Sequence, residues 1–367
     1  MKCPGLDSRY LSPDGIAPLV QKFSPEVIGK SVRGEAIPLL TLGNGPIRIL
    51  AWSQMHGNES TTTRALADFL NGCLMGELDQ LLSEVTLKII PQLNPDGSRD
   101  YSRTNAAGAD LNRDFVNLSQ PESRALWSVF EQFNPDFCFN LHDQRTIFGA
   151  GETGKPATVS FLAPSYDHQK SMNPVRKRAV EVICAINEKL QKEIPGCVGR
   201  FDDGFNPQCV GDAFTAKGAA TILFEAGHFR ADYHRHTTRK LIFKSLVWAL
   251  EYIGSTVFGK NRLADYLLIP QNKICFYDIV YKNVKINYDS NVLITNFAVQ
   301  YREEPFEGDM RFVAEIASIG KLGGFFGHLE FEAEGAEFKS ASFGPPQIGS
   351  IANFSLGSRE FENGLPK

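Results

Sequence analysis

The sequence predicts an α/β fold with helices on both faces of a sheet, followed by a small C-terminal antiparallel β domain. Over the first 260 residues, apolar runs rich in β-branched residues alternate with segments whose apolar residues recur at helical spacing. Beyond that point, long stretches alternate between polar and apolar residues with a period of two. A chain of 367 residues is long enough for one large and one small domain.

Four apolar runs are expected to form the buried strands of the sheet. They span residues 48–54, 85–92, 135–143 and 219–227. Helical spacing of apolar residues marks the segments between and after them. These span residues 60–74, 121–133, 173–191 and 236–253. Because strands and helices alternate along the chain, helices should cover both faces of the sheet.

The domain boundary is expected between residues 260 and 262, where the pattern changes. Residues 1–260 would form the catalytic domain and residues 262–367 the β-rich domain. In the second part, residues 274–301 and 327–343 alternate with a period of two, which is typical of half-buried strands. The tail after Phe361 is expected to be disordered.

Composition excludes several classes of protein. A net charge of -4 and a pI near 6.0 give no basic excess, so nucleic acid is not an expected partner. No apolar run is long enough to span a bilayer, and the first residues lack the features of a secretory signal, so we expect a cytoplasmic protein with no membrane partner. The seven cysteines form no CxxC pair, and neither a disulfide framework nor a cysteine zinc site is indicated.

Polar clusters follow each of the expected strands. His56 and Glu59 follow the first, the NPDG turn at residues 94–97 follows the second, and His142 and Glu225 end the third and fourth. Open α/β sheets bind ligands where the carboxyl ends of their strands meet helix starts. Two imidazoles and one carboxylate suit a catalytic zinc ion, so His56, Glu59 and His142 are the expected ligands of one zinc per chain. Glu225 is then the candidate for the carboxylate that moves the proton.

The ordered motifs identify a resemblance. The chain contains HxxE at His56, then NPDG, then R-x-N-x-x-G-x-D-x-N-R from Arg103 to Arg113, then the strand-end His142 and finally Glu225. In this order they resemble the zinc carboxypeptidases, especially the bacterial type, over roughly residues 25–255 with a lead-in strand hairpin at 28–43. The resemblance implies a mixed β-sheet and hydrolysis of a C-terminal amide bond by zinc-activated water with a glutamate as general base.

Carried over by position, the resemblance assigns the remaining site residues. His56, Glu59 and His142 would bind zinc, and Glu225 would serve as general base and acid. Arg103 would stabilise the oxyanion, while Asn112 and Arg113 would hold the free carboxylate of the substrate.

Asp110 would accept the spare N–H of the first zinc histidine, although an Asx-turn is an equally weighted interpretation. The segment before Glu225 would carry the specificity pocket. There Asp202, Asp203 and Asp212 could recognise a basic or amino-bearing substrate, or could simply be solvated loop acids.

A second enzyme family remains open. The aspartoacylase and succinylglutamate desuccinylase group is similar, because HGNE, DLNR, NLHD and EAG fit both groups and its members also carry a C-terminal β domain that narrows the site to small N-acyl amino acids. The NPDG turn and the step from Arg103 to Asn112 favour the peptidases, which we rank first. Their substrates would be short peptides, with cell-wall peptides ending in D-amino or diamino acids as one class.

A third hypothesis is a binding module or pseudoenzyme that keeps the fold but does not catalyse a reaction. It is disfavoured because the expected ligands and Glu225 are all present. The sequence indicates neither an oligomeric state nor the role of the β domain.

Overall fold

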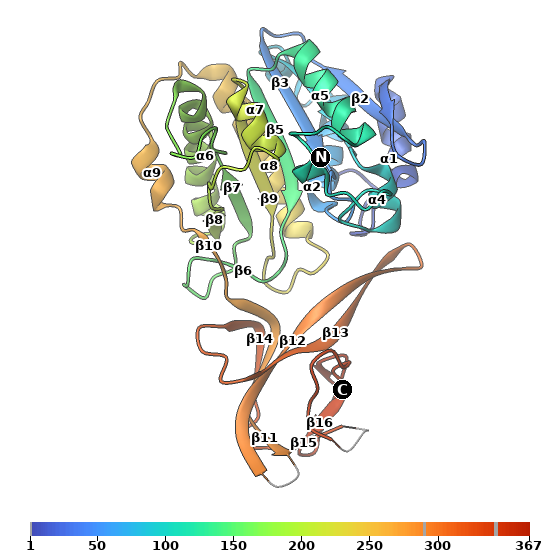
Figure 1. Cartoon of the computed structure of the whole chain (residues 1–367), viewed down its shortest axis with the longest axis vertical. Helices are drawn as coiled ribbons and strands as arrows, with labels where there is room; N and C mark the ends of the chain where they lie inside the picture. Colours follow the sequence, from blue (N-terminus) through green and yellow to red (C-terminus); the bar gives the residue numbers. More distant parts are fainter. Residues whose placement is uncertain (1, 289–290, 341–343) are drawn as a thin grey trace. The chain divides into compact units, whose positions relative to one another are not determined.

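The computed structural model describes residues 2–288, 291–340 and 344–367, and it divides into two compact units (Figure 1). Unit 1 comprises Met1–Gln144 and Ala157–Asn272, and unit 2 comprises Arg145–Pro156 and Lys273–Lys367. Parts of the two alternating runs expected at 274–301 and 327–343, namely residues 289–290 and 341–343, lie outside the described residues.

A mixed sheet forms the centre of unit 1. Its strand order among the described residues is β1-β2-β4-β3-β5-β9-β7-β8. The strands are β1 (Glu26–Lys30), β2 (Ala36–Leu42), β3 (Ile47–Ser53), β4 (Val85–Ile90), β5 (Phe137–Asp143), β7 (Val159–Leu162), β8 (Val198–Arg200) and β9 (Ala220–Ala226). Neighbours β4, β3, β5 and β9 run parallel, whereas the β1–β2, β2–β4 and β7–β9 pairs are antiparallel. The four parallel strands therefore end at the same edge of the sheet.

Helices cover both faces of this sheet (Figure 1). The helices are α1 (Pro13–Val20), η1 (Gln21–Phe23), α2 (Thr61–Leu74), α3 (Asp79–Leu82), α4 (Pro95–Asp100), η2 (Leu111–Arg113), α5 (Pro121–Phe133), α6 (Pro174–Glu193), α7 (Val210–Ala216), α8 (His236–Ser255) and α9 (Leu263–Leu268). Along β3, Ile49 and Ala51 pack in the core with α2, α6 and α8, whereas Leu50 and Trp52 pack with α5 and α7. This alternation is what a strand buried on both faces requires.

The fold class predicted from the sequence is confirmed for this unit. The four expected strands correspond to β3, β4, β5 and β9, and the four expected helices to α2, α5, α6 and α8. The lead-in segment at residues 28–43 forms the antiparallel β1–β2 pair. No helix within the described ranges combines the length and the apolar character needed to cross a membrane.

Unit 2 consists of β strands. They are β6 (Phe148–Ala150), β10 (Asn272–Ile274), β11 (Phe276–Tyr288), β12 (Asn291–Phe306), β13 (Asp309–Gly320), β14 (Phe326–Glu332), β15 (Phe338–Lys339), β16 (Phe354–Leu356), β17 (Arg359–Glu362) and β18 (Leu365–Pro366). Two sheets have the orders β13-β12-β11-β14 and β15-β16-β17-β18, and β6 pairs with β10. Their pairs are antiparallel except for β11–β14, which is parallel.

The end of the chain is ordered, so the expectation of a disordered tail after Phe361 is wrong. β17 and β18 form an antiparallel pair, and Phe361 is buried in the aromatic core of unit 2. Gly364 makes the turn with φ +77°, and its carbonyl oxygen accepts a hydrogen bond from the hydroxyl of Tyr281. The ring of Phe361 and the hydrogen bonds of Asn363 and Gly364 therefore fix the tail.

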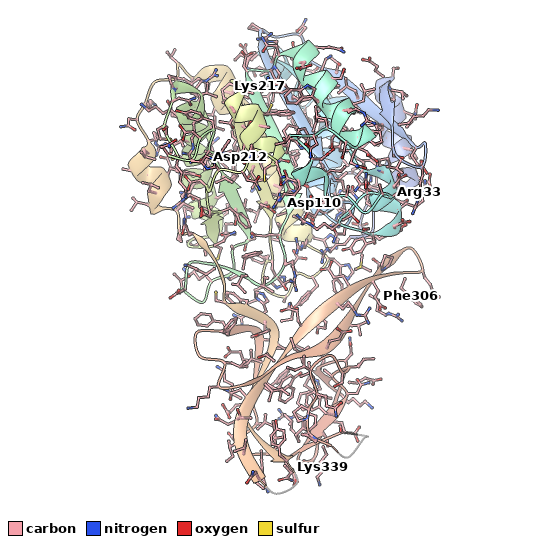
Figure 2. The ribbon with its side chains drawn as sticks, in the orientation of Figure 1. Arg33, Asp110, Asp212, Lys217, Phe306 and Lys339 are labelled. Atoms are coloured by element: carbon pink, nitrogen blue, oxygen red, sulfur yellow. The ribbon has the colours of Figure 1, made fainter. Side chains whose placement is uncertain are left out.

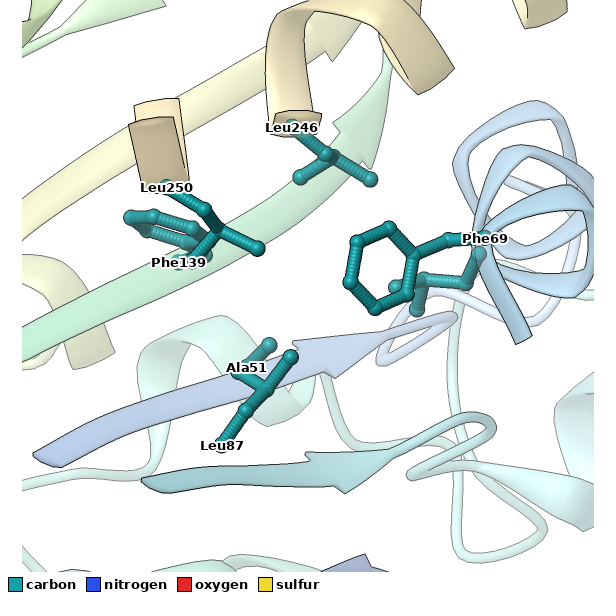
Figure 3. A pocket seen from close by; sticks show the side chains of 7 residues that line it. Ala51, Phe69, Leu87, Phe139, Leu246 and Leu250 are labelled. Atoms are coloured by element: carbon teal, nitrogen blue, oxygen red, sulfur yellow. The ribbon is translucent and has the colours of Figure 1, made fainter. Parts of the chain in front are cut away.

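A small apolar pocket lies in the core of unit 1 between the sheet and helices α2 and α8 (Figure 3). It is lined by Ala51, Leu66, Phe69, Leu87, Phe139, Leu246 and Leu250. The ring of Phe139, from the middle of β5, packs edge-on against that of Phe224 in β9, with their centroids 5.2 Å apart. Phe139 thus anchors the strand that carries His142 near its end.

Replacing Phe139 with alanine should lower the free energy of unfolding by about 3–5 kcal/mol, because the change removes a buried ring and enlarges the pocket that this ring lines. Denaturant titration followed by circular dichroism measures this loss. The matched control is Val257→Ala, since Val257 is 92% exposed and its change should alter stability by no more than about 0.5 kcal/mol. A loss below about 1 kcal/mol in the Phe139→Ala protein would contradict the assignment of this ring to the tightly packed core.

Candidate metal centre

The candidate metal centre lies where the parallel strands of unit 1 end. β5 pairs with β3 on one side and with β9 on the other, both in parallel. His56 and Glu59 follow the end of β3, and His142 lies near the end of β5. In the register of β5 and β9, His142 is directly opposite Glu225. The sheet therefore brings together four side chains from three segments that are far apart in the sequence.

Glu59 contacts both histidines at once. The Nδ1 atom of His56 is 2.7 Å from Oε1 of Glu59, and the Nδ1 atom of His142 is 2.7 Å from Oε2. All three side chains are buried, and one ligand atom from each lies within 4.8 Å of the others. The three ligands predicted from the sequence thus converge on one point and present the nitrogen or oxygen atoms that a metal ion binds.

The electrostatics of the triad suit a metal. Burial by itself would raise the pKa of Glu59, but the two histidines hold it well below its usual range, so the carboxylate is ionised. Burial lowers the pKa of His142 and favours its neutral form. For His56, burial would lower the pKa, but Glu59 and Asp110 raise it above the usual value. Metals bind deprotonated ligands, and two imidazoles with one carboxylate match catalytic zinc.

Asp110 links the triad to the neighbouring loop. Its Oδ1 atom lies 2.9 Å from Nε2 of His56 and also accepts the backbone N–H of Asn112 at 2.9 Å. With the proton on Nε2, the Nδ1 atom of His56 keeps its lone pair for a metal. The second contact makes an Asx-type turn at the start of η2. The two roles expected for Asp110, a contact with the first histidine and an Asx-turn, thus occur together.

Arg103 lies beside this carboxylate. Its Nε and Nη2 atoms donate to Oδ2 of Asp110 at 3.2 and 3.1 Å, and its Nη1 atom is 3.4 Å from Oε1 of Glu59. The side chain is 50% exposed, so the guanidinium lies between the buried triad and solvent. It can meet negative charge that develops near the triad.

Asn112 and Arg113 contact the start of α7. The Oδ1 atom of Asn112 accepts the backbone N–H of Val210 at 3.1 Å. Nη1 of Arg113 donates to the carbonyl oxygen of Asn112 at 2.7 Å and contacts Sγ of Cys209 at 3.1 Å. Cys209 and Val210 were not among the residues predicted to form the site. No sequence signal could have found these contacts, because 98 residues separate Asn112 from Val210.

Glu225 lies opposite His142 on β9, and its side chain is partly buried. Its Oε2 atom is buried and has no hydrogen-bond partner within the described part of the chain. Burial raises the pKa of Glu225 well above its usual value, and the carboxylates of Glu59 and Asp143 raise it further. A buried polar atom with no partner is costly, and such atoms are concentrated where a substrate or ion supplies the contact.

The three acidic residues expected on the specificity segment have different surroundings. Asp203 pairs with Arg176 and with Lys170, and Asp202 pairs with Lys170 at 3.2 Å. Asp212, labelled in Figure 2, is buried and accepts the backbone N–H of Asn206 at 3.1 Å. Burial raises its pKa to about 6. Of the three acids, it alone has no ion pair in the described ranges.

Known proteins are similar to this chain in sequence and in fold. Residues 21–148 match the sequence model of the family described as zinc carboxypeptidase. A gamma-D-glutamyl-L-diamino acid endopeptidase 1 of Lysinibacillus sphaericus is 36% identical over 262 residues, covering 54% of this chain and 66% of that protein. A protein named probable carboxypeptidase 2 in Trichophyton verrucosum is 27% identical, covering 49% of this chain and 34% of its own length. The chain thus spans less than two thirds of each of these relatives.

The fold has solved counterparts. The crystal structure of a metallo-carboxypeptidase from Burkholderia cenocepacia superposes with a TM-score of 0.52 at 20% identity, covering 66% of this chain and 69% of that one. At this identity the match supports the fold and not a function. The matched segment contains His56, Glu59 and His142, which form the metal-binding triad. Residues 21–148 are thus similar to the zinc carboxypeptidases, and the triad in this segment could hold a metal ion.

Proposed function

We propose that this protein is a zinc-dependent metallocarboxypeptidase that hydrolyses the C-terminal amide bond of a peptide. The observation that carries the proposal is the buried Oε2 atom of Glu225, which has no partner among the described residues and lies on the strand next to His142. A carboxylate held in this way is available to a reacting group. Burial raises the pKa of Glu225, which suits a group that must accept a proton and then release it.

Each residue of the centre has a place in this reaction. When bound, zinc supplies Lewis acidity toward water and toward the scissile carbonyl group. Glu225 accepts the proton of the attacking water and then donates it to the departing amine. Asp110 holds His56 in the tautomer that leaves Nδ1 available, and it also orients the guanidinium of Arg103. Arg103 stabilises the negative charge on the carbonyl oxygen in the transition state.

Asn112 and Arg113 recognise the chain end in this proposal. A guanidinium is permanently charged and can hold a carboxylate through two parallel hydrogen bonds. Arg113 is exposed to solvent, and its Nη1 atom contacts the carbonyl oxygen of Asn112 and Sγ of Cys209. These contacts fix the direction of the guanidinium before a substrate arrives, which reduces the entropy lost on binding.

Two observations support a more specific substrate class, peptides whose terminal residue carries an amino group, including cell-wall peptides. The Lysinibacillus relative is named for cleavage before an L-diamino acid. In this chain Asp212 is a buried acid without an ion pair among the described residues, and it lies two residues after Val210, which holds Asn112. An ammonium group on the substrate could neutralise this carboxylate.

A panel of substrates tests the reaction class with the zinc-loaded protein. It pairs peptides with free and amidated C-termini, ending in a diamino acid or in leucine, with N-acetyl and N-succinyl amino acids. We expect release of the terminal residue from the free peptides only, and faster release of the diamino acid. Turnover of only the N-acyl amino acids would instead establish the aspartoacylase-like alternative, in which the same centre hydrolyses a small N-acyl group.

Glu225→Gln should lower kcat by about two to four orders of magnitude, the usual range for loss of a general acid–base group. Glutamine keeps the shape of the side chain but cannot accept the proton, so zinc content should stay at the parent level. Steady-state kinetics and metal analysis measure the two quantities. Glu251→Gln is the matched control, because Glu251 is an exposed acid on α8 that pairs with Lys189. A kcat within a few-fold of the parent would assign the proton transfer to another group.

Arg113→Ala should raise KM for peptides with a free C-terminal carboxylate by at least about tenfold, because a contact formed in the ground state is lost. The already poor turnover of amidated peptides should hardly change. Arg124→Ala serves as the control, since Arg124 is an exposed arginine that likewise donates to backbone carbonyl groups, those of Leu118 and Ser119. Equal effects on free and amidated peptides would show that Arg113 does not recognise the carboxylate.

A further inference from the structure

We propose that Asp143 is a positioning residue of the metal centre, which fastens the start of α2, and with it Glu59, to the end of β5. Asp143 directly follows His142, and its side chain is 4% exposed. Its carboxylate accepts hydrogen bonds from two backbone N–H groups at the start of α2. It would therefore act through Glu59 and His142 and not on the substrate.

Helix α2 begins without a side-chain cap of its own. Ser60 occupies the N-cap position, but it makes no capping hydrogen bond, and its hydroxyl group donates instead to the carbonyl oxygen of Arg9. Asp143 supplies the capping hydrogen bonds instead. Its Oδ2 atom accepts the N–H of Thr61 at 2.7 Å, and its Oδ1 atom accepts the N–H of Thr62 at 3.1 Å. An anion at a helix N-terminus is also stabilised by the helix dipole.

These contacts close a ring around Glu59. The backbone N–H of Asp143 donates to Oε2 of Glu59 at 3.1 Å, and Nδ1 of His142 is 2.7 Å from the same oxygen. Thr61, two residues after Glu59, donates its backbone N–H to the carboxylate of Asp143. Main-chain and side-chain atoms of Asp143 thus hold the carboxylate of Glu59 beside His142.

Arg235 extends this support to the neighbouring strand. Its Nη1 atom is 3.9 Å from Oδ2 of Asp143 and donates to the carbonyl oxygen of Ala226 at 2.6 Å. Its Nη2 atom donates to the carbonyl oxygen of Gln144 at 2.7 Å. Ala226 follows Glu225 and is opposite Asp143 in the sheet. The buried cation therefore balances the charge of Asp143 and joins the ends of β5 and β9.

A purely structural role for Asp143 makes a different prediction, and the chain offers a matched control. Asp68 is also buried, lies on the same helix α2, and accepts a backbone N–H, that of Cys3 at 2.6 Å. It pairs with Arg239 of α8 at 2.7 Å. Asp68 and Asp143 are thus both buried carboxylates that accept a backbone N–H. Each also lies near a buried arginine, Arg239 for Asp68 and Arg235 for Asp143. Among the described residues, Asp68 makes no contact with the triad.

The decisive measurement is the zinc dissociation constant, obtained by competition with a chromophoric chelator. Asp143→Asn keeps the shape but removes the charge and replaces one acceptor by an N–H₂ group. We expect it to weaken zinc binding by about 10–100-fold, the usual effect of losing a group that orients a ligand. Asp68→Asn should lower the thermal midpoint while keeping the zinc dissociation constant within about threefold of the parent.

Two results would overturn the proposal. One is a dissociation constant for Asp143→Asn within about threefold of the parent, and the other is an equal weakening in Asp68→Asn, which would make loss of stability the common cause. If Asp143→Asn does not fold, Asp143→Glu decides: it keeps the charge but displaces the carboxylate, so zinc binding should weaken by at least about tenfold, and unchanged binding rejects the role. Zinc affinity is independent of peptidase activity, so a failure of the proposed function would be distinguishable.

Discussion

The parallel register of β5 against β9 is the constraint on which the candidate site depends. It places His142 opposite Glu225 and Asp143 opposite Ala226. Since successive side chains of a strand point to opposite faces, a shift of one residue would turn His142 away from Glu59. The apolar ring of Phe139 against Phe224 opposes such a shift from within the core. Packing in the centre of the sheet thus sets the geometry of polar groups at its edge.

The position of the triad could be predicted from the sequence because its signals are local. An apolar run followed by HxxE, and a second run that ends in a histidine, each place a ligand at a strand end without knowledge of the rest of the chain. The main helices and strands were predictable for the same reason, because their apolar residues keep a regular period. Helix α7 was missed: it has only seven residues, too few to show that period.

Other contacts could not be predicted, because they join residues that are distant in the sequence. The sequence does not distinguish the three acids Asp202, Asp203 and Asp212. In the structure, Lys170 pairs with Asp202 and Asp203, and Arg176 pairs with Asp203. Local capping rules point to Ser60 as the residue that should cap α2, whereas the carboxylate comes from residue 143. Burial and long-range partners decide such cases, and both depend on the complete fold.

The order in which the chain is synthesised has a consequence for unit 2, because that unit is discontinuous. Arg145–Pro156 leaves unit 1 directly after β5, yet its strand β6 pairs with β10, and Gly149 packs closely against Cys275 and Phe276. On a ribosome this short segment emerges long before its partners and must wait, unpaired, until residues 273–367 follow. A stop codon near residue 272 would therefore not release a clean first unit, because it would leave β6 without its partner strand β10 and so expose a strand edge to aggregation.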